Sequence, residues 1–247
     1  MKVQFVGVGE AFDESLPNNS QLLEWDGCRL LIDCGYAVPH ALWRLYPDAN
    51  YIDAVYISHR HADHYFGLPS YLLRLDEDGR RRPLVILCPE KQVILEMIDY
   101  AYQGVLAKLA FEADIREVST ERPVEFQNSR MEFAVSSHPV KNFAVAVHAE
   151  NKKYAYSGDG NFNKHTRQLY TGCSLLVHEA YALDQDVPGH ARIGEVLQMA
   201  REQGVRKLAL THLQRDVRRK KRFEIEALIR DSGLEVLIPE PGDIHEM

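Results

Sequence analysis

The stretch Ile57-Ser58-His59-Arg60-His61-Ala62-Asp63-His64-Tyr65-Phe66-Gly67-Leu68-Pro69 places three imidazoles and a carboxylate within six residues. Neutral imidazole and carboxylate oxygen are ligands that divalent transition metals take from proteins. A histidine-rich surface loop is the alternative, but it gives no reason for His at positions i, i+2 and i+5 with Asp at i+4. The spacing therefore predicts a metal site.

The residues on either side of this stretch indicate how it is held. The run Asp53-Ala54-Val55-Tyr56-Ile57 is short, apolar and β-branched, which predicts a buried strand that ends where the histidines begin. Gly67-Leu68-Pro69 then leads into a helical pattern over 70–75. A strand before the loop and a helix after it would hold the side chains of the three histidines and Asp63 so that they point toward one metal site.

Bulk properties restrict the class of protein. The chain has 247 residues, is 45% hydrophobic and contains no linker-like segment, which predicts one domain over 1–247. A net charge of -7 gives no overall attraction to nucleic acid or anionic lipid. The four cysteines form no CxxC pair, there is no apolar signal core, and no apolar run reaches 18 residues. We therefore expect a cytoplasmic protein with no membrane partner.

Strand-like runs and helical patterns alternate in both halves of the chain. The first half predicts strands at 2–8, 21–25, 29–33, 53–57 and 84–88, with helices at 39–46, 70–75 and 90–101. The second half predicts strands at 124–128, 131–136, 143–147, 154–157, 174–179, 207–211 and 234–238, with helices at 193–203 and 223–231. Two β-rich halves, each followed by helices, predict an α/β protein with a four-layer αβ/βα sandwich. The metal would lie at the edge where the two sheets meet.

Further candidate ligands follow expected strands. His138 comes after the strand at 131–136, Asp159 lies in the glycine-rich Ser157-Gly158-Asp159-Gly160, and His212 follows the strand at 207–211. Asp33 ends the strand at 29–33, and it either orients a metal-binding histidine or caps a turn. Gly7-Val8-Gly9 suggests a dinucleotide-binding loop, but Phe12 stands where the third glycine belongs, so we reject that interpretation.

With these ligands, the chain resembles the metallo-β-lactamase superfamily, whose HxHxDH signature appears as His59-Arg60-His61-Ala62-Asp63-His64. The similarity extends to the tRNase Z (ribonuclease Z) branch. The segments that follow that branch in order are Phe5-Val6-Gly7-Val8-Gly9, Asn19-Ser20, Leu31-Ile32-Asp33-Cys34-Gly35, Asp63-His64-Tyr65-Phe66-Gly67-Leu68-Pro69, Tyr156-Ser157-Gly158-Asp159, His178-Glu179-Ala180 and Gly189-His190. The resemblance covers almost the whole chain and implies the metallo-β-lactamase fold.

The resemblance also implies roles for individual residues. One zinc would be held by His59, His61 and His138, the other by Asp63, His64 and His212, and Asp159 would bridge them; Mn2+ or Fe2+ could replace Zn2+. Two cations ~3.5–4 Å apart can share a hydroxide that attacks a phosphodiester. The catalytic residues would be Asp63, His190 as general acid and Glu179, which orients His190. A helix cap or a surface histidine is the alternative for His190. Related enzymes are commonly dimers, which leaves a homodimer open.

Three departures from the nuclease branch bear on the substrate. His138 and Asp159 are only 21 positions apart, which leaves no room for the arm that grips tRNA. The residues after His190 and Asp159 also differ from those of the branch. A basic run follows His212, and within it Arg215 and Arg218 would bind phosphate if they face the cleft. Otherwise the run is the solvated start of the last helix.

The leading hypothesis is a dinuclear zinc phosphodiesterase that uses a metal-bridging hydroxide on an RNA end, a cyclic nucleotide or another small phosphodiester. An acyl hydrolase, such as a lactonase, thioesterase or β-lactamase-like enzyme, is the alternative, because the same hydroxide attacks acyl carbons. An iron-containing oxygen-reducing protein of the superfamily usually has Glu where His61 stands. A non-catalytic binding module is disfavoured, since all seven ligand positions are filled.

Overall fold

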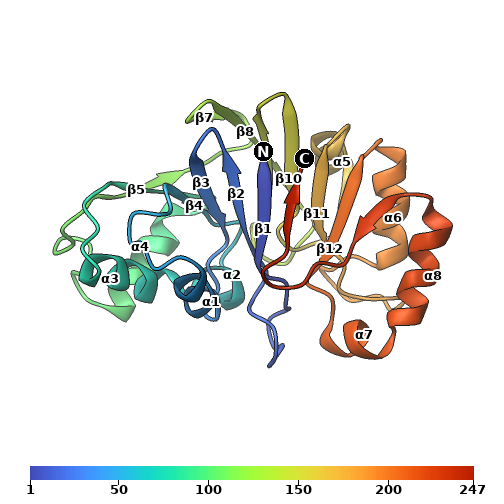
Figure 1. The fold of residues 1–247 in the computed structure, drawn as a ribbon, viewed down its shortest axis with the longest axis horizontal. Coiled ribbons are helices and arrows are strands. Elements are labelled where there is room, and N and C mark those ends of the chain that lie inside the picture. Colours follow the sequence, from blue (N-terminus) through green and yellow to red (C-terminus); the bar gives the residue numbers. More distant parts are fainter.

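Two β-sheets face each other, and helices cover the outer side of each sheet (Figure 1). The structure is a computed structural model that describes residues 1–247. Three buried hydrophobic clusters separate the four layers: one lies between the sheets and one lies under the helices on each outer side. The α/β class and the four-layer αβ/βα sandwich predicted from the sequence are confirmed.

Each sheet has seven strands. In spatial order, the first sheet contains β14 (Ile244–Glu246), β1 (Lys2–Gly7), β2 (Ser20–Trp25), β3 (Cys28–Ile32), β4 (Ala54–Tyr56), β5 (Leu84–Cys88) and β6 (Ala113–Glu117). The second contains β13 (Glu235–Leu237), β12 (Lys207–Thr211), β11 (Leu175–Glu179), β10 (Lys152–Tyr156), β9 (Phe143–Ala149), β8 (Ser129–Val135) and β7 (Val124–Phe126). The first and last strands of the chain, β1 and β14, pair antiparallel and lie side by side in Figure 1.

The helices are divided between the two outer faces. The first sheet is covered by α1 (Val38–Leu45), α3 (Leu68–Glu77) and α4 (Lys91–Ala101), and the second by α5 (Lys164–Tyr170), α6 (Ile193–Glu202) and α8 (Arg222–Ser232). Two short helices, α2 (Ala62–Tyr65) and α7 (Arg215–Lys220), lie toward the lower edge of the view in Figure 1. No helix combines the length and the apolar character needed to cross a bilayer.

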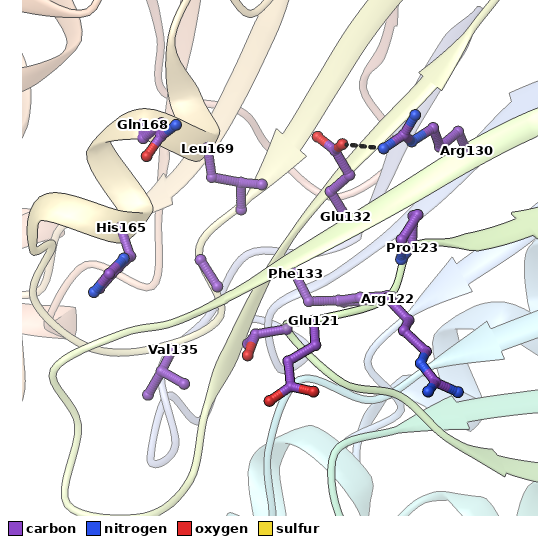
Figure 2. A pocket seen from close by; sticks show the side chains of 12 residues that line it. Glu121, Arg122, Pro123, Arg130, Glu132, Phe133, Val135, His165, Gln168 and Leu169 are labelled. Carbon is purple, nitrogen blue, oxygen red and sulfur yellow. Dashed lines mark ion pairs between the residues drawn. The ribbon is translucent and has the colours of Figure 1, made fainter.

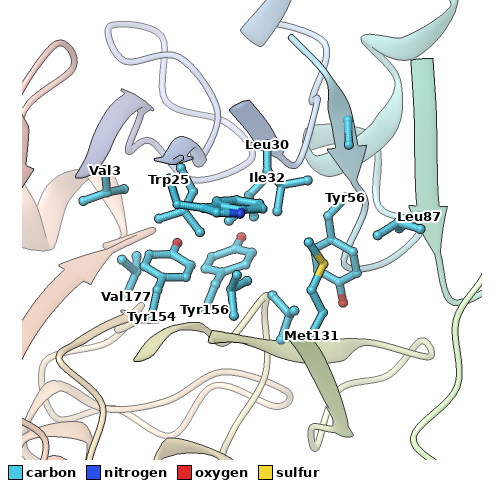
Figure 3. Packing of buried hydrophobic residues seen from close by; sticks show 14 of the residues in the cluster. Val3, Trp25, Leu30, Ile32, Tyr56, Leu87, Met131, Tyr154, Tyr156 and Val177 are labelled. Atoms are coloured by element: carbon cyan, nitrogen blue, oxygen red, sulfur yellow. The ribbon is translucent and has the colours of Figure 1, made fainter. Parts of the chain in front are cut away.

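The core between the sheets is built from strand residues that alternate in direction. Figure 3 shows Trp25 and Ile32 of the first sheet facing Tyr154 and Tyr156 of β10. The hydroxyl of Tyr156 is buried but not isolated, because it donates to Asp33 Oδ2 at 2.8 Å. The core therefore reaches directly to the polar edge where the candidate ligands lie.

The hairpin expected across Asp26-Gly27 is present, since β2 and β3 pair antiparallel and both turn residues have positive φ, 45° and 77°. Gly7 has a different function from the one a dinucleotide motif would give it. A Cβ on Gly7 would lie 2.1 Å from the carbonyl oxygen of Asn18. Glycine is therefore required for the close approach of two backbone segments, which agrees with the rejection of a dinucleotide loop.

Several elements were not expected from the sequence. They are α2, α5, α7, β6 and β14. The basic run after His212 forms α7, a separate helix, before α8 begins at Arg222. The helix expected at 70–75 is longer and begins at Leu68, with Pro69 in its first turn, where proline is well tolerated.

Candidate metal centre and active-site cleft

Loops that follow strands of both sheets meet at one edge and bring all seven candidate ligands together. The loop after β4 carries His59 and His61, and α2 carries Asp63 and His64. His138 follows β8, Asp159 follows β10, and His212 follows β12. Five of these side chains are buried, namely His59, Asp63, His64, Asp159 and His212, so the strand ends hold them away from solvent.

The first group of ligand atoms contains His59, His61, His138 and Asp159, all within 4.8 Å of one another. His61 Nδ1 lies 3.2 Å from His59 Nε2 and 3.1 Å from His138 Nε2. Asp159 Oδ2 lies 3.9 Å from His59 Nε2. Three imidazole nitrogens and one carboxylate oxygen thus face a common point.

The second group contains Asp63, His64, His212 and again Asp159. Asp63 Oδ2 lies 3.2 Å from His64 Nε2 and 3.3 Å from His212 Nε2. Asp159 approaches the same two imidazoles with different oxygens, Oδ1 at 3.4 Å from His64 and Oδ2 at 3.5 Å from His212. Asp159 is the residue that both groups share.

These distances fit metal coordination. Ligands about 2.0–2.1 Å from a tetrahedral zinc are separated from each other by ~3.3 Å. Most of the nitrogen and oxygen separations in both groups lie close to that value. Two of the atoms aimed into the site, His64 Nε2 and Asp159 Oδ1, are buried and have no hydrogen-bond partner. Buried polar atoms without a partner are costly, and a cation between them would satisfy both.

The protonation of the histidines differs between the two groups. Burial lowers the pKa of His59 well below its usual value, and burial also lowers the pKa of His61 and of His138. Neutral imidazole is the form that binds a metal. Burial also disfavours the charged form of His212, but the carboxylates of Asp159 and Asp63 outweigh it and raise the pKa to about 9. The second group therefore favours a positive charge between its carboxylates.

Asp33 orients one of the histidines, one of the two roles that the sequence left open for it. Its Oδ2 lies 2.7 Å from His64 Nδ1, which leaves His64 Nε2 to face the ligand group. The backbone N–H and the hydroxyl of Ser58 donate to Asp33 at 2.7 and 2.8 Å. Ser58 also lies 3.0 Å from His59 Nδ1, a contact that the sequence did not predict although Ser58 directly precedes the first histidine.

Replacing Asp33 with asparagine is expected to weaken metal binding about 10- to 100-fold, because His64 loses the carboxylate that fixes its ring and increases its basicity. Competition with a chromogenic chelator measures this change, and the thermal midpoint reports whether the fold is retained. Asp231→Asn on exposed α8 is the matched control. Equal affinity in a folded Asp33→Asn variant would contradict the role assigned to Asp33.

Glu179 and His190 lie beside the ligands. His190 Nδ1 is 3.3 Å from Glu179 Oε1, although this contact lacks the geometry of a hydrogen bond. Glu179 is fully buried, and its Oε1 accepts the backbone N–H groups of Gly160 and Ala191 at 3.1 and 2.9 Å. One carboxylate thereby fixes the chain next to Asp159 and next to His190. Glu179, His190 and His212 also form a third close group of ligand-type atoms.

A cleft of about 350 Å³ opens over these residues. Its lining includes parts of both ligand groups together with His190. It also includes residues that the sequence did not indicate as part of a site, namely Glu10, Ala11, Phe12, Tyr36 and Tyr181. Tyr181 stacks on His190 with ring centroids 4.6 Å apart, and His190 stacks on His212 at 5.7 Å. The cleft therefore has a polar base and aromatic walls.

The two arginines expected to hold phosphate are engaged elsewhere. Arg215 Nη1 pairs with Glu10 Oε1 at 2.5 Å, and Arg218 pairs with Glu240 at 2.9 Å and donates to the carbonyl of Pro239. Neither arginine belongs to the lining of the cleft. The charge of each guanidinium is thus offset by a carboxylate, and the structure does not bring either arginine into the site.

A larger hollow of about 660 Å³ lies away from the ligands (Figure 2). It opens between β8 and α5, where Figure 2 shows His165 and Gln168 on the helix side and Arg130 paired with Glu132 on the strand side. None of its lining residues belongs to a group of metal-ligand atoms. The smaller cleft is therefore the candidate active site.

The two facing sheets and the clustered histidines and aspartates define a protein of the metallo-β-lactamase fold with the ligand set of a metal-dependent hydrolase. Within that class, the chain belongs to the anti-Pycsar protein Apyc1 family, whose family model matches residues 1–230. A relative, the anti-Pycsar protein Apyc1 of Paenibacillus harenae, is 31% identical over 205 residues, which cover 80% of this chain and 83% of that protein.

Two solved structures share the fold. The metallo-β-lactamase fold protein YhfI from Bacillus subtilis superposes with a TM-score of 0.82 at 24% identity and covers 99% of this chain and 98% of its own. Human tRNase Z, short form, superposes with a TM-score of 0.80 at 20% identity, covering 100% of this chain and 99% of its own. The resemblance to the metallo-β-lactamase superfamily and its tRNase Z branch is confirmed.

Proposed function

We propose that this protein hydrolyses a small phosphodiester, of the size of a cyclic nucleotide, at a pair of zinc ions. The observation that carries the proposal is the position of Asp159, whose two oxygens reach the imidazoles of both ligand groups. His59, His61 and His138 would hold one ion, and Asp63, His64 and His212 the other. A shared carboxylate would hold two ions close enough together to act on one phosphate.

Bound zinc would polarise the phosphoryl oxygens and lower the pKa of an attacking water. The chain's own contribution is to fix the ligands and to shape the cleft. Asp33 and Ser58 hold the rings of His64 and His59, as their contacts of 2.7 and 3.0 Å indicate. The burial of these groups excludes bulk water, which strengthens the electrostatic interactions within the site.

His190 is proposed as the general acid. Its Nδ1 faces Glu179, which leaves Nε2 to donate a proton to the alkoxide that leaves when the P–O bond breaks. Glu179 acts as a positioning residue. It holds the backbone next to Asp159 through the N–H of Gly160 and the backbone next to His190 through the N–H of Ala191. The helix-cap alternative for His190 receives no support, because α6 begins at Ile193 and its first-turn groups are not bonded by the His190 side chain.

The shape and charge of the cleft favour a small substrate over an RNA end. A volume of about 350 Å³ is near the lower end of the roughly 300–1,000 Å³ of small-molecule pockets. The segment between His138 and Asp159 forms β9, β10 and their turns, with no arm. Arg215 and Arg218 are paired with carboxylates, so neither offers a free guanidinium to the phosphates of an RNA chain. Of the three phosphodiesters that the sequence left open, a cyclic nucleotide fits best.

Zinc-loaded protein is expected to open a cyclic mononucleotide to its phosphomonoester, to lose this activity on treatment with 1,10-phenanthroline, and to regain it on addition of Zn2+. Chromatography of substrate and product measures the rate, with pre-tRNA, an acyl-homoserine lactone and an acyl thioester assayed in parallel. Hydrolysis of the lactone or the thioester without any phosphodiester cleavage would overturn the proposal in favour of an acyl hydrolase.

A further inference from the structure

The loop over residues 10–18 forms one wall of the cleft and presents an aromatic ring there. Phe12 lines the cleft, yet 75% of its surface is exposed. Tyr36, which also lines the cleft, is 48% exposed. Single exposed apolar residues are common, but neighbouring apolar side chains at a groove mark a surface that contacts a ligand. Two such rings at the mouth of an active-site cleft therefore indicate a ligand with an apolar, flat part.

The loop is fixed rather than free, so the ring of Phe12 is presented in a defined place. Glu10 is fully buried, and its carboxylate accepts the N–H of Phe12 at 2.8 Å while pairing with Arg215. The hydroxyl of Tyr36 donates to the carbonyl of Ala11. The backbone on either side of Phe12 is thereby held to α7 and to the segment after β3.

A second set of contacts holds the far side of the same loop. Arg219 of α7 pairs with Asp13 at 3.0 Å and with Glu14 at 2.6 Å, and it also donates to the hydroxyl of Ser15 at 2.9 Å. Asp13 in turn accepts the backbone N–H of Ser15 at 2.8 Å. Two basic residues of α7, Arg215 and Arg219, thus hold the loop through its carboxylates.

Tyr36 also connects the loop to the ligand segment. It follows Gly35, and a Cβ on Gly35 would lie only 1.9 Å from the carbonyl oxygen of Asp63. The neighbouring Cys34 donates its N–H to the carbonyl of His64 at 2.7 Å. The exposed rings of Phe12 and Tyr36 are therefore at a fixed place relative to the second ligand group.

We propose that Phe12 and Tyr36 form a stacking site for the nucleobase of the substrate. This inference rests on the proposed function, because it places the base of a nucleotide substrate at Phe12 and Tyr36 while its phosphate lies at the metal ligands. The flat faces of purines and pyrimidines stack on aromatic side chains, and Phe12 offers an exposed ring without a polar group. Glu10 does not compete as a hydrogen-bonding partner for the base, since its oxygens are engaged by Arg215 and the Phe12 N–H.

The test compares a cyclic mononucleotide with glycerol 1,2-cyclic phosphate, which carries a cyclic phosphodiester and no base. Phe12→Ala is expected to lower kcat/KM for the nucleotide about 10-fold or more, mainly through KM, and to change the rate with the glycerol compound less than about twofold. Phe223→Ala is the matched control, because Phe223 is 84% exposed on α8 and does not line the cleft. The control is expected to behave as the unmodified protein with both substrates.

Two further variants separate stacking from general apolar contact. Phe12→Trp is expected to retain nucleotide hydrolysis because it keeps a flat ring, whereas Phe12→Leu is expected to lose as much as Phe12→Ala. A Leu variant as active as the unmodified protein, or an equal loss with both substrates, would overturn the stacking site. Failure of the unmodified protein to cleave either substrate would instead overturn the proposed function, so the two failures are distinguishable.

Discussion

Replacing Asp159 with alanine is expected to lower kcat/KM for a cyclic nucleotide by at least about 10³-fold, equivalent to about 4 kcal/mol of transition-state stabilisation. The reason is that Asp159 is the only residue common to both four-residue ligand groups. Its loss removes one ligand from each group and separates the two sites. The buried imidazoles of His64 and His212 then keep Asp63 but lose the second of the two carboxylates that contact both of them.

Two measurements on the purified variant accompany the kinetics. Metal content per chain is expected to fall well below that of the unmodified protein, and circular dichroism is expected to show a retained fold, because Asp159 lies at the edge of the sheets and not in a hydrophobic cluster. Asp231→Ala, which removes an exposed carboxylate of α8, is the control and is expected to change neither quantity. A folded Asp159→Ala protein with full activity would exclude the two-metal mechanism.

Replacing His190 with alanine is expected to have an effect that depends on the leaving group. With a cyclic nucleotide, whose leaving group is an alkoxide, kcat is expected to fall about 10²- to 10⁴-fold, the range typical of a lost general acid. With bis(p-nitrophenyl) phosphate, the leaving p-nitrophenolate needs no proton, so the loss is expected to be less than about 10-fold. Metal content is expected to remain unchanged.

His165→Ala is the matched control for His190, since His165 is an exposed histidine on α5 outside the cleft. Glu179→Gln is expected to follow the pattern of His190→Ala more weakly, because the amide keeps one oxygen for the N–H groups of Gly160 and Ala191 but loses the charge that faces the imidazole. If His190→Ala lowered the rates with both leaving groups equally, His190 would serve binding or metal retention and not proton transfer.

The convergence of the seven candidate ligands could be predicted from the sequence because metal ligation imposes a dense and specific pattern. Four ligands fall within six residues, and His138, Asp159 and His212 each follow a run that is strongly strand-like. Strand ends meet at a common edge when two sheets face each other. Ligands that follow different strands can therefore lie close together even when they are far apart along the chain. The role of Asp33 was left open, because its partner His64 is 31 residues away and only the structure shows the contact.

The elements that the sequence did not predict have weak hydrophobic patterns. In β6, only Ile115 is buried, so this edge strand reads as a charged segment. β14 has three residues and exists through its pairing with β1 at the other end of the chain. In α5, a capping box at Asn163 defines the start of a short helix that has few apolar residues. Hydrophobic periodicity carries little information where pairing with a distant strand or a helix cap determines the structure.

The walls of the cleft were also beyond prediction from the sequence, for a different reason. The only motif near the loop over 10–18 was the incomplete glycine motif that begins at Gly7, and Phe12 was noted as the residue that breaks it. Its position in the cleft depends on ion pairs with arginines about 205 residues later in the chain. The same ion pairs explain why the basic run after His212 could be taken for a phosphate site, since the sequence shows the arginines but not the carboxylates that face them.

X-ray diffraction from crystals of the metal-loaded protein, recorded on either side of the zinc absorption edge, tests the central claim most directly. Two anomalous peaks are expected per chain, ~3.5–4 Å apart. One should lie among His59, His61 and His138 and the other among Asp63, His64 and His212, with Asp159 between them. A single peak, or peaks away from these residues in crystals grown with excess zinc, would contradict the two-metal centre.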